Sequence, residues 1–254
     1  MAGQLQDKVA LVTGGGRGIG RATALAMARE GARVVIANRS VAEGEETVRL
    51  VTDTGGKATF VQTDVTRPAE VEAVIAHAVQ RYGRLDCAFN NAGYEGMRVP
   101  TAEIPEEDWE RTIRTNLTGV WLCMKYAIQQ MLKQGGGVIV NMSSVVGHVG
   151  LPGIAPALVA SHHGIIGLTR QAAVEYARHG IRVNAVCPTV TRTPRFDRVH
   201  GGNPEVEARM AARNPSGRIG ESEDAAAAVV WLCSDAASFV VGHTLVVDGG
   251  VLAQ

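Results

Sequence analysis

The chain of 254 residues carries no net charge, because 25 Lys and Arg side chains balance 25 Asp and Glu side chains. A balanced charge gives no electrostatic basis for binding nucleic acid or an anionic membrane. No run approaches the roughly 20 apolar residues that a membrane span needs, and the first eight residues lack an apolar signal-peptide core. We therefore expect a cytoplasmic protein with neither a nucleic-acid nor a membrane partner.

Cysteine is also scarce. Cys87, Cys123, Cys187 and Cys233 lie far apart and without the paired spacing of metal ligands. The adjacent pair His162-His163 is a poor metal pair, since neighbouring helical side chains point about 100° apart. We predict buried reduced thiols and no metal site.

Hydrophobic residues make up 46% of the chain and charged residues 20%, which favours a folded protein with one sizeable core. Short apolar runs alternate with segments of helical spacing from start to finish. This alternation predicts an α/β fold, a single-domain Rossmann-type doubly wound parallel sheet over residues 1–254. Strands are expected at 9–12, 33–37, 58–62, 87–89, 138–142, 182–186 and 244–250, and helices from 21, at 69–82, 104–116, 119–133, 159–179 and 221–232, the last capped by Ser222.

A glycine-rich stretch, residues 13–20, follows the first predicted strand directly and opens the first predicted helix. Glycine allows a tight turn and lets the backbone approach a pyrophosphate, which the helix N-terminus also favours. Strand, glycine turn and helix in this order therefore indicate dinucleotide binding. The predicted contacts in the turn are Gly14, Gly16, Arg17, Gly18 and Ile19.

The spacing Gly14-x-x-x-Gly18-x-Gly20 resembles the fingerprint of the short-chain dehydrogenase/reductase family. Residues 90–93, Asn-Asn-Ala-Gly, resemble a second motif of that family, found at the end of the central strand. The resemblance extends over nearly the whole chain and implies an oxidoreductase with a nicotinamide cofactor. It also implies a homo-oligomer, a tetramer formed through the long helices and the closing segment 244–252. Further cofactor contacts implied by matching positions are Asp64, Val65, Asn91, Ala92, Gly93, Pro188, Val190 and Thr193.

The second predicted strand ends in Asn38-Arg39-Ser40, where this fold meets the adenosine ribose. An acidic residue there would bind the 2′-hydroxyl and repel a 2′-phosphate, but the strand end has no carboxylate. Arg39 offers a charge-assisted fork to that phosphate, and Arg17 adds a second positive charge. We expect NADP(H) to be favoured over NAD(H).

The family's catalytic residues are a tyrosine, a lysine four residues later, a serine and a helix asparagine. Asn116 and Ser144 match the asparagine and the serine. Residues 155–164, APALVASHHG, resemble the family's Tyr-Val-Ala-Ser-Lys-His-Gly, which places Leu158 at the tyrosine position and His162 at the lysine position. Counting forward from Ser144 by the commonest family spacing reaches Ala157 instead.

His162 has two possible roles in this pattern. The first is proton donor, which would require a bridging water or a different substrate pose. The second is hydrogen-bonding partner of the cofactor ribose, which would make His162 one of the cofactor contacts. Thr189 occupies a position where the family has glycine. Residues 193–218, which follow shortly after it, are the predicted substrate lid.

Three functions fit this pattern. The first is an NADP(H)-dependent oxidoreductase that acts on a carbonyl, alcohol or imine group of a small-molecule substrate. The second is an NADP(H)-binding pseudoenzyme, and the third a structural subunit that pairs with an active relative. The family resemblance favours the first, and the altered Tyr-x-x-x-Lys element is the feature that leaves the other two as alternatives.

Overall fold

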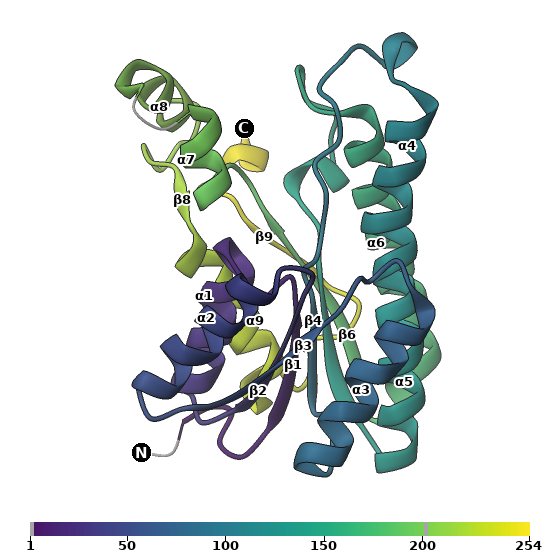
Figure 1. The fold of residues 1–254 in the computed structure, drawn as a ribbon. Coiled ribbons are helices and arrows are strands. Elements are labelled where there is room, and N and C mark those ends of the chain that lie inside the picture. The colour runs from purple at the N-terminus through teal and green to yellow at the C-terminus, as the bar shows by residue number, and fades with distance from the viewer. Residues whose placement is uncertain (1–2, 201–202) are drawn as a thin grey trace.

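The computed structural model describes residues 3–200 and 203–254, which form seven parallel strands in one sheet with helices on both faces (Figure 1). The sheet order is β3-β2-β1-β4-β5-β6-β9. The strands are β1 (Val9–Thr13), β2 (Arg33–Asn38), β3 (Lys57–Gln62), β4 (Cys87–Asn90), β5 (Gly137–Met142), β6 (Ile181–Pro188) and β9 (Thr244–Val247). The predicted single-domain, doubly wound parallel sheet is confirmed.

Two groups of helices cover the sheet. Helices α3, α5 and α6 lie on one face, and α1, α2 and α9 lie on the other (Figure 1). Their bounds are α1 (Gly18–Arg29), α2 (Val41–Asp53), α3 (Pro68–Tyr82), α5 (Gly119–Gln134), α6 (Pro156–Tyr176) and α9 (Ser222–Cys233). Short 3₁₀ turns occupy Thr101–Glu103, Val145–Gly147, Ala177–His179, Asp235–Ala237 and Val251–Ala253.

Strands β1 and β4, at the centre of the sheet, are buried along their whole length because helices cover both of their faces. All five residues of β1 are buried. One core cluster includes Leu85, Met131, Ile139, Ile165 and Ile181, and a second, on the α1 and α9 side, includes Leu5, Met27, Ile36, Phe89 and Leu232. Burial of each such side chain contributes about 1.5 to 3 kcal/mol, which holds the strand ends in fixed positions. The four cysteines are buried and free, as predicted.

The strand order reverses between β1 and β4. From β1 the chain moves outward to β2 and β3, and from β4 it moves the other way to β5 and β6. Thr13 and Asn90, the last residues of β1 and β4, are register partners. Ligands of open α/β sheets bind at such a reversal, beyond the carboxyl ends of the strands.

The predicted pair of helices at 104–116 and 119–133 is one continuous helical path. Helix α4 (Glu106–Ile113) passes through a π-helical turn, Arg114–Thr118, directly into α5. Asn116 lies in this turn. A π-turn inside an α-helix rotates the side chains that follow it, and such turns are frequent at functional sites.

The segment predicted as a lid contains two short helices, α7 (Pro194–His200) and α8 (Pro204–Ala211), beside a small sheet of β7 (Thr191–Arg192) and β8 (Gly220–Glu221) (Figure 1). Residues 201 and 202 of this segment lie outside the described residues. The predicted cap Ser222 is wrong: Glu221 is the N-cap of α9, and its N–H donates to the Asp224 carboxylate at 2.8 Å. No helix within residues 3–200 and 203–254 is both long and apolar enough to span a membrane.

Candidate functional site

A cavity of about 370 Å³ lies at the carboxyl edge of the sheet, over the reversal between β1 and β4. It brings together most of the residues that the sequence analysis selected: Gly14, Arg17, Gly18, Ile19, Asn38, Arg39, Asp64, Val65, Asn91, Ala92, Gly93, Asn116, Leu158, His162 and Thr193. Gly16, Ser40, Ser144, Pro188 and Val190 are not among the residues that line it. The glycine turn forms one part of the lining of this cavity, and the start of α6 forms another.

The glycine turn is fixed against the end of β4 by close backbone contacts. Gly14 and Gly18 have φ angles of +64° and +53°, which favour glycine. A Cβ on Gly20 would collide with the Gly14 carbonyl oxygen and lie 2.6 Å from Asn91 Nδ2. Asn91 Nδ2 instead donates to the Thr13 carbonyl at 3.0 Å. Each of these glycines is therefore required by the shape of the turn.

A carboxylate that the sequence analysis missed lies at the end of β2. Glu43, in the first turn of α2, accepts from Asn38 Nδ2 at 3.4 Å and pairs with Arg17 Nη1 at 3.5 Å. It was missed because it follows the strand by five residues and approaches only through the start of the helix. Ser40 caps that helix, where its hydroxyl accepts from the Glu43 N–H at 3.4 Å.

Arg39 and Asp64 line the cavity beside this carboxylate. Burial of Asp64 favours its neutral form, but hydrogen bonds from the Thr66 N–H and hydroxyl outweigh burial, so that the pKa of Asp64 is lowered. The Arg39 guanidinium acts in the same direction. Asp64 is therefore ionised at neutral pH.

Asn116 holds the backbone that follows the Asn-Asn-Ala-Gly motif. Its Oδ1 accepts from the Tyr94 N–H and its Nδ2 donates to the Tyr94 carbonyl, both at 2.7 Å. The side chain of Asn116 is buried, and this pairing uses both of its polar ends. The π-turn thus fixes the wall of the cavity between β4 and α4.

Leu158 and His162 lie one turn apart at the start of α6 and both face the cavity. Leu158 is aliphatic and carries no proton that a reaction could use. His162 Nδ1 is buried and has no hydrogen-bond partner among the described residues. Burial, with a smaller contribution from His163, lowers the pKa of His162 to about 4. The imidazole is therefore neutral at pH 7.

Ser143, rather than Ser144, lines the cavity. The Ser143 hydroxyl donates to the His162 carbonyl at 3.2 Å. The Ser144 hydroxyl donates to the Pro188 carbonyl and accepts from the Val146 N–H, each at 3.3 Å. The paired serines after β5 were the only sequence signal for Ser143.

The cavity also contains residues that the sequence analysis did not select. These are Gly20, Thr63, Tyr94, Glu95, Thr115, Val120, Met142, Ile165 and Pro194, together with Ser143. Tyr94 directly follows the Asn-Asn-Ala-Gly motif, which was the available signal for it. Pro188 and Thr189 line a separate cavity of about 200 Å³ with Arg218 and Asp248.

The described residues offer a cradle for a dinucleotide but no cluster for a metal. Glycines with positive φ, a buried histidine nitrogen without a partner and a long cavity fit an elongated polar cofactor. Within the described residues, no group of three or more His, Cys, Asp or Glu side chains could hold a metal ion.

Comparison with known proteins gives consistent matches over the whole chain. The family described as Enoyl-(Acyl carrier protein) reductase matches residues 14–252. The chain is 46% identical over 248 residues to cis-4-hydroxycyclohexanecarboxylate dehydrogenase of Sinomonas cyclohexanicum, with 97% of each chain covered. It is 42% identical over 250 residues to 2,5-dichloro-2,5-cyclohexadiene-1,4-diol dehydrogenase of Sphingobium indicum, with 98% of each covered.

The fold gives the same result. The crystal structure of levodione reductase superposes with a TM-score of 0.93 and 37% identity, covering 98% of this chain and 99% of that one. Fold, motif positions and relatives agree, and together they imply a nicotinamide cofactor. The chain belongs to the short-chain dehydrogenase/reductase family.

Proposed function

We propose that this protein is an NADP(H)-dependent oxidoreductase with an altered proton-donor site. It acts on the carbonyl, alcohol or imine group of a small organic molecule. The observation that carries the proposal is the single cavity that joins the glycine turn to Asn116, Leu158 and His162. When bound, the cofactor supplies or accepts the hydride.

The glycine turn and the start of α1 would hold the pyrophosphate, because their N–H groups and the helix dipole favour negative charge. Asp64 and Val65 would lie beside the adenine. Asn91, Ala92 and Gly93 would pass along the nicotinamide ribose, with His162 as a further ribose partner. Four residues outside the cavity wall remain proposed contacts, and the cofactor would have to extend beyond that wall to reach them: Gly16, Ser40, Pro188 and Val190.

The preference for NADP(H) rests on Arg39. Within the described residues its guanidinium makes no hydrogen bond or ion pair and interacts with Asp64 only at longer range, so it is available to a 2′-phosphate. Arg17 is partly neutralised by Glu43. Glu43 therefore opposes the phosphate, and Arg39 is the group that decides the preference.

The other end of the cavity lacks a proton donor at the positions where the family has tyrosine and lysine. Leu158 has no ionisable group, and His162 is neutral because burial lowers its pKa to about 4. A positioned general acid contributes about 10² to 10⁴-fold to proton transfer. Ketones should therefore react slowly, and a protonated imine, which already carries its proton, should react faster.

The relatives support an alicyclic alcohol or ketone as the substrate, since two of them are named for acting on substituted six-membered rings. An apolar wall that includes Leu158, Met142 and Ile165 suits such a ring. The same site would serve both oxidation of the alcohol and reduction of the ketone.

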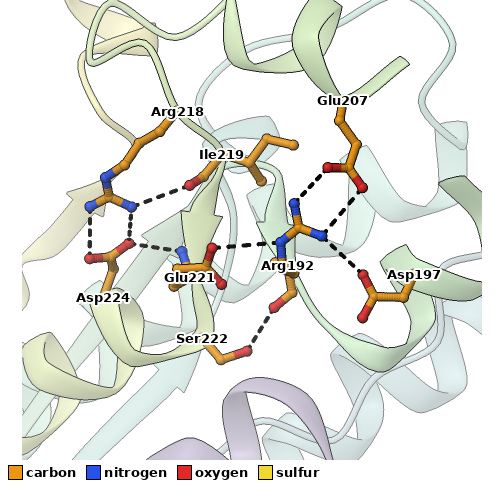
Figure 2. A network of polar contacts seen from close by, with 8 residues as sticks. All are labelled: Arg192, Asp197, Glu207, Arg218, Ile219, Glu221, Ser222 and Asp224. Atoms are coloured by element: carbon orange, nitrogen blue, oxygen red, sulfur yellow. Dashed lines mark hydrogen bonds and ion pairs between the residues drawn. The ribbon is translucent and has the colours of Figure 1, made fainter. Parts of the chain in front are cut away.

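Residues 193–218 form the proposed lid. One arginine joins it to the small β7–β8 sheet: Arg192 contacts Glu207 of α8 at 2.8 Å, Asp197 of α7 at 3.3 Å and Glu221 of β8 at 3.6 Å (Figure 2). The Ser222 hydroxyl donates to the Arg192 carbonyl at 2.9 Å. Glu207 is the largest cause that raises the pKa of Arg192. A network of three carboxylates on one guanidinium is more effective than an isolated surface pair.

A homotetramer and a cytoplasmic location complete the proposal. Exposed apolar side chains on the long helices, Trp121 on α5 and Val174 on α6, support an interface between copies of the chain.

We expect NADPH to bind about tenfold or more tightly than NADH, because only NADPH offers Arg39 a phosphate. Arg39→Ala should remove most of this difference and leave NADH affinity nearly unchanged. Glu43→Gln should strengthen NADPH binding, since it frees Arg17. Calorimetric titration of both cofactors checks this, and equal affinities in the parent protein would contradict it.

We expect the double change Leu158→Tyr and His162→Lys to raise the rate of ketone reduction by about 10²-fold or more, because it restores a general acid and the charge that assists it. Leu158→Tyr alone should gain less, since an unassisted phenol has a pKa near about 10. Single-turnover NADPH oxidation measures the step. No gain in a double variant that still binds NADPH would show that Leu158 and His162 do not occupy the acid positions.

We expect Arg192→Gln to loosen the lid, so that amide hydrogen exchange over 194–200 and 203–211 becomes about threefold or more faster. The matched control is Arg49→Gln, because Arg49 also contacts two carboxylates, Glu46 and Asp53, but lies on α2. Exchange in the lid helices that is unchanged in Arg192→Gln, or equally faster in both variants, would contradict the role of Arg192.

A further inference from the structure

Tyr94 has the only phenyl ring among the described residues that line the cavity. It follows Gly93 in the loop after β4, the central strand of the sheet, and shares the cavity with Leu158 and His162. Nothing in the proposed cofactor site or in the proton-donor positions uses its side chain.

Tyr94 is held at both its backbone and its hydroxyl. Asn116 pairs with its N–H and its carbonyl. The phenol donates to Asp108 Oδ1 at 3.0 Å, and the other oxygen of this buried carboxylate accepts from the Met97 N–H at 2.7 Å. A side chain fixed in this way loses little further freedom when a ligand packs against it.

The environment of the ring decides what it can offer a ligand. The Arg111 guanidinium lies 4.3 Å from the ring centroid, where a cation is attracted by the aromatic face. The hydroxyl proton is used by Asp108 and one face of the ring by Arg111, which leaves the rest of the ring as the surface that Tyr94 can offer a substrate. Leu158 adds an aliphatic surface to the same cavity.

We propose that Tyr94 is a specificity-determining residue, a fixed aromatic wall that selects ring-shaped alcohols and ketones over open-chain ones of equal carbon number. A puckered alicyclic ring has no free internal rotations to lose when it packs against an aromatic side chain, whereas an open chain must give up several. This inference rests on the proposed function, because it names the shape of substrate at that same site.

The test measures ligand binding without turnover. Cyclohexanone and 2-hexanone are titrated by saturation-transfer NMR into the protein saturated with NADP⁺, which cannot donate hydride. We expect the parent protein to prefer cyclohexanone about tenfold, and Tyr94→Ala to lose this preference by weakening cyclohexanone alone. Tyr94→Phe keeps the ring but loses the bond to Asp108, so its preference should be intermediate. Phe239→Ala, which removes a fully exposed ring outside the cavity, should match the parent.

Steady-state kinetics with NADPH add a second readout. Tyr94→Phe should raise KM for cyclohexanone and leave kcat within about twofold, because the change loosens the position of the ring and not the hydride step. A preference that survives in Tyr94→Ala, or an equal loss for both ketones with NADP⁺ affinity intact, overturns the inference. A parent protein that does not bind NADP⁺ contradicts the proposed function instead.

Discussion

The close approach of the glycine turn to the end of β4 is the constraint on which the cavity depends. Gly20 can have no side chain because the Gly14 carbonyl and the Asn91 amide occupy that space. The Asn91 amide bonds to the Thr13 carbonyl, and this joins the ends of β1 and β4 where the strand order reverses. This contact between the strand ends positions the parts of the site beyond that edge of the sheet, from the start of α1 to the cavity wall that Asn116 holds. A larger residue at Gly20 would separate the two strand ends and open the cavity floor.

The chemistry of the site depends on the side chains at the start of α6 that face the cavity. Members of an oxidoreductase family transfer hydride, and a carbonyl oxygen then needs a proton. In this chain Leu158 has none to give, and burial keeps the His162 imidazole neutral. Under the proposed function, the cavity would therefore support cofactor binding more strongly than proton transfer. Substrates that bring their own proton, or that react in the oxidative direction with solvent as the base, would suit it best.

The main parallel sheet could be predicted from the sequence, because buried parallel strands are continuous apolar runs and the glycine turn has a local signature, whereas α2, α7, α8 and the small β7–β8 sheet were not predicted. Each predicted strand lies within about two residues of its observed bounds, apart from the last, which was predicted to end at residue 250 and ends at Val247. The features that the sequence could not predict depend on which side chains the folded chain brings close together. Glu43 reaches the end of β2 only through the first turn of α2, and Asn116 lies in a π-turn that helical spacing does not reveal. Ser143 and Ser144 differ by one position, and only the path of the chain after β5 decides which faces the cavity.

We propose that neither Leu158 nor His162 supplies a charged proton donor near neutral pH. NMR titration of the His162 imidazole tests it most directly, with its signals assigned by their loss in His162→Gln. Because burial disfavours the imidazolium form, the folded-state pKa lies below the ordinary value, and the signals should stay constant from pH 8 to about pH 5 and move only near pH 4. A midpoint at or above about 6.5 would make His162 a proton donor at physiological pH and would contradict the account.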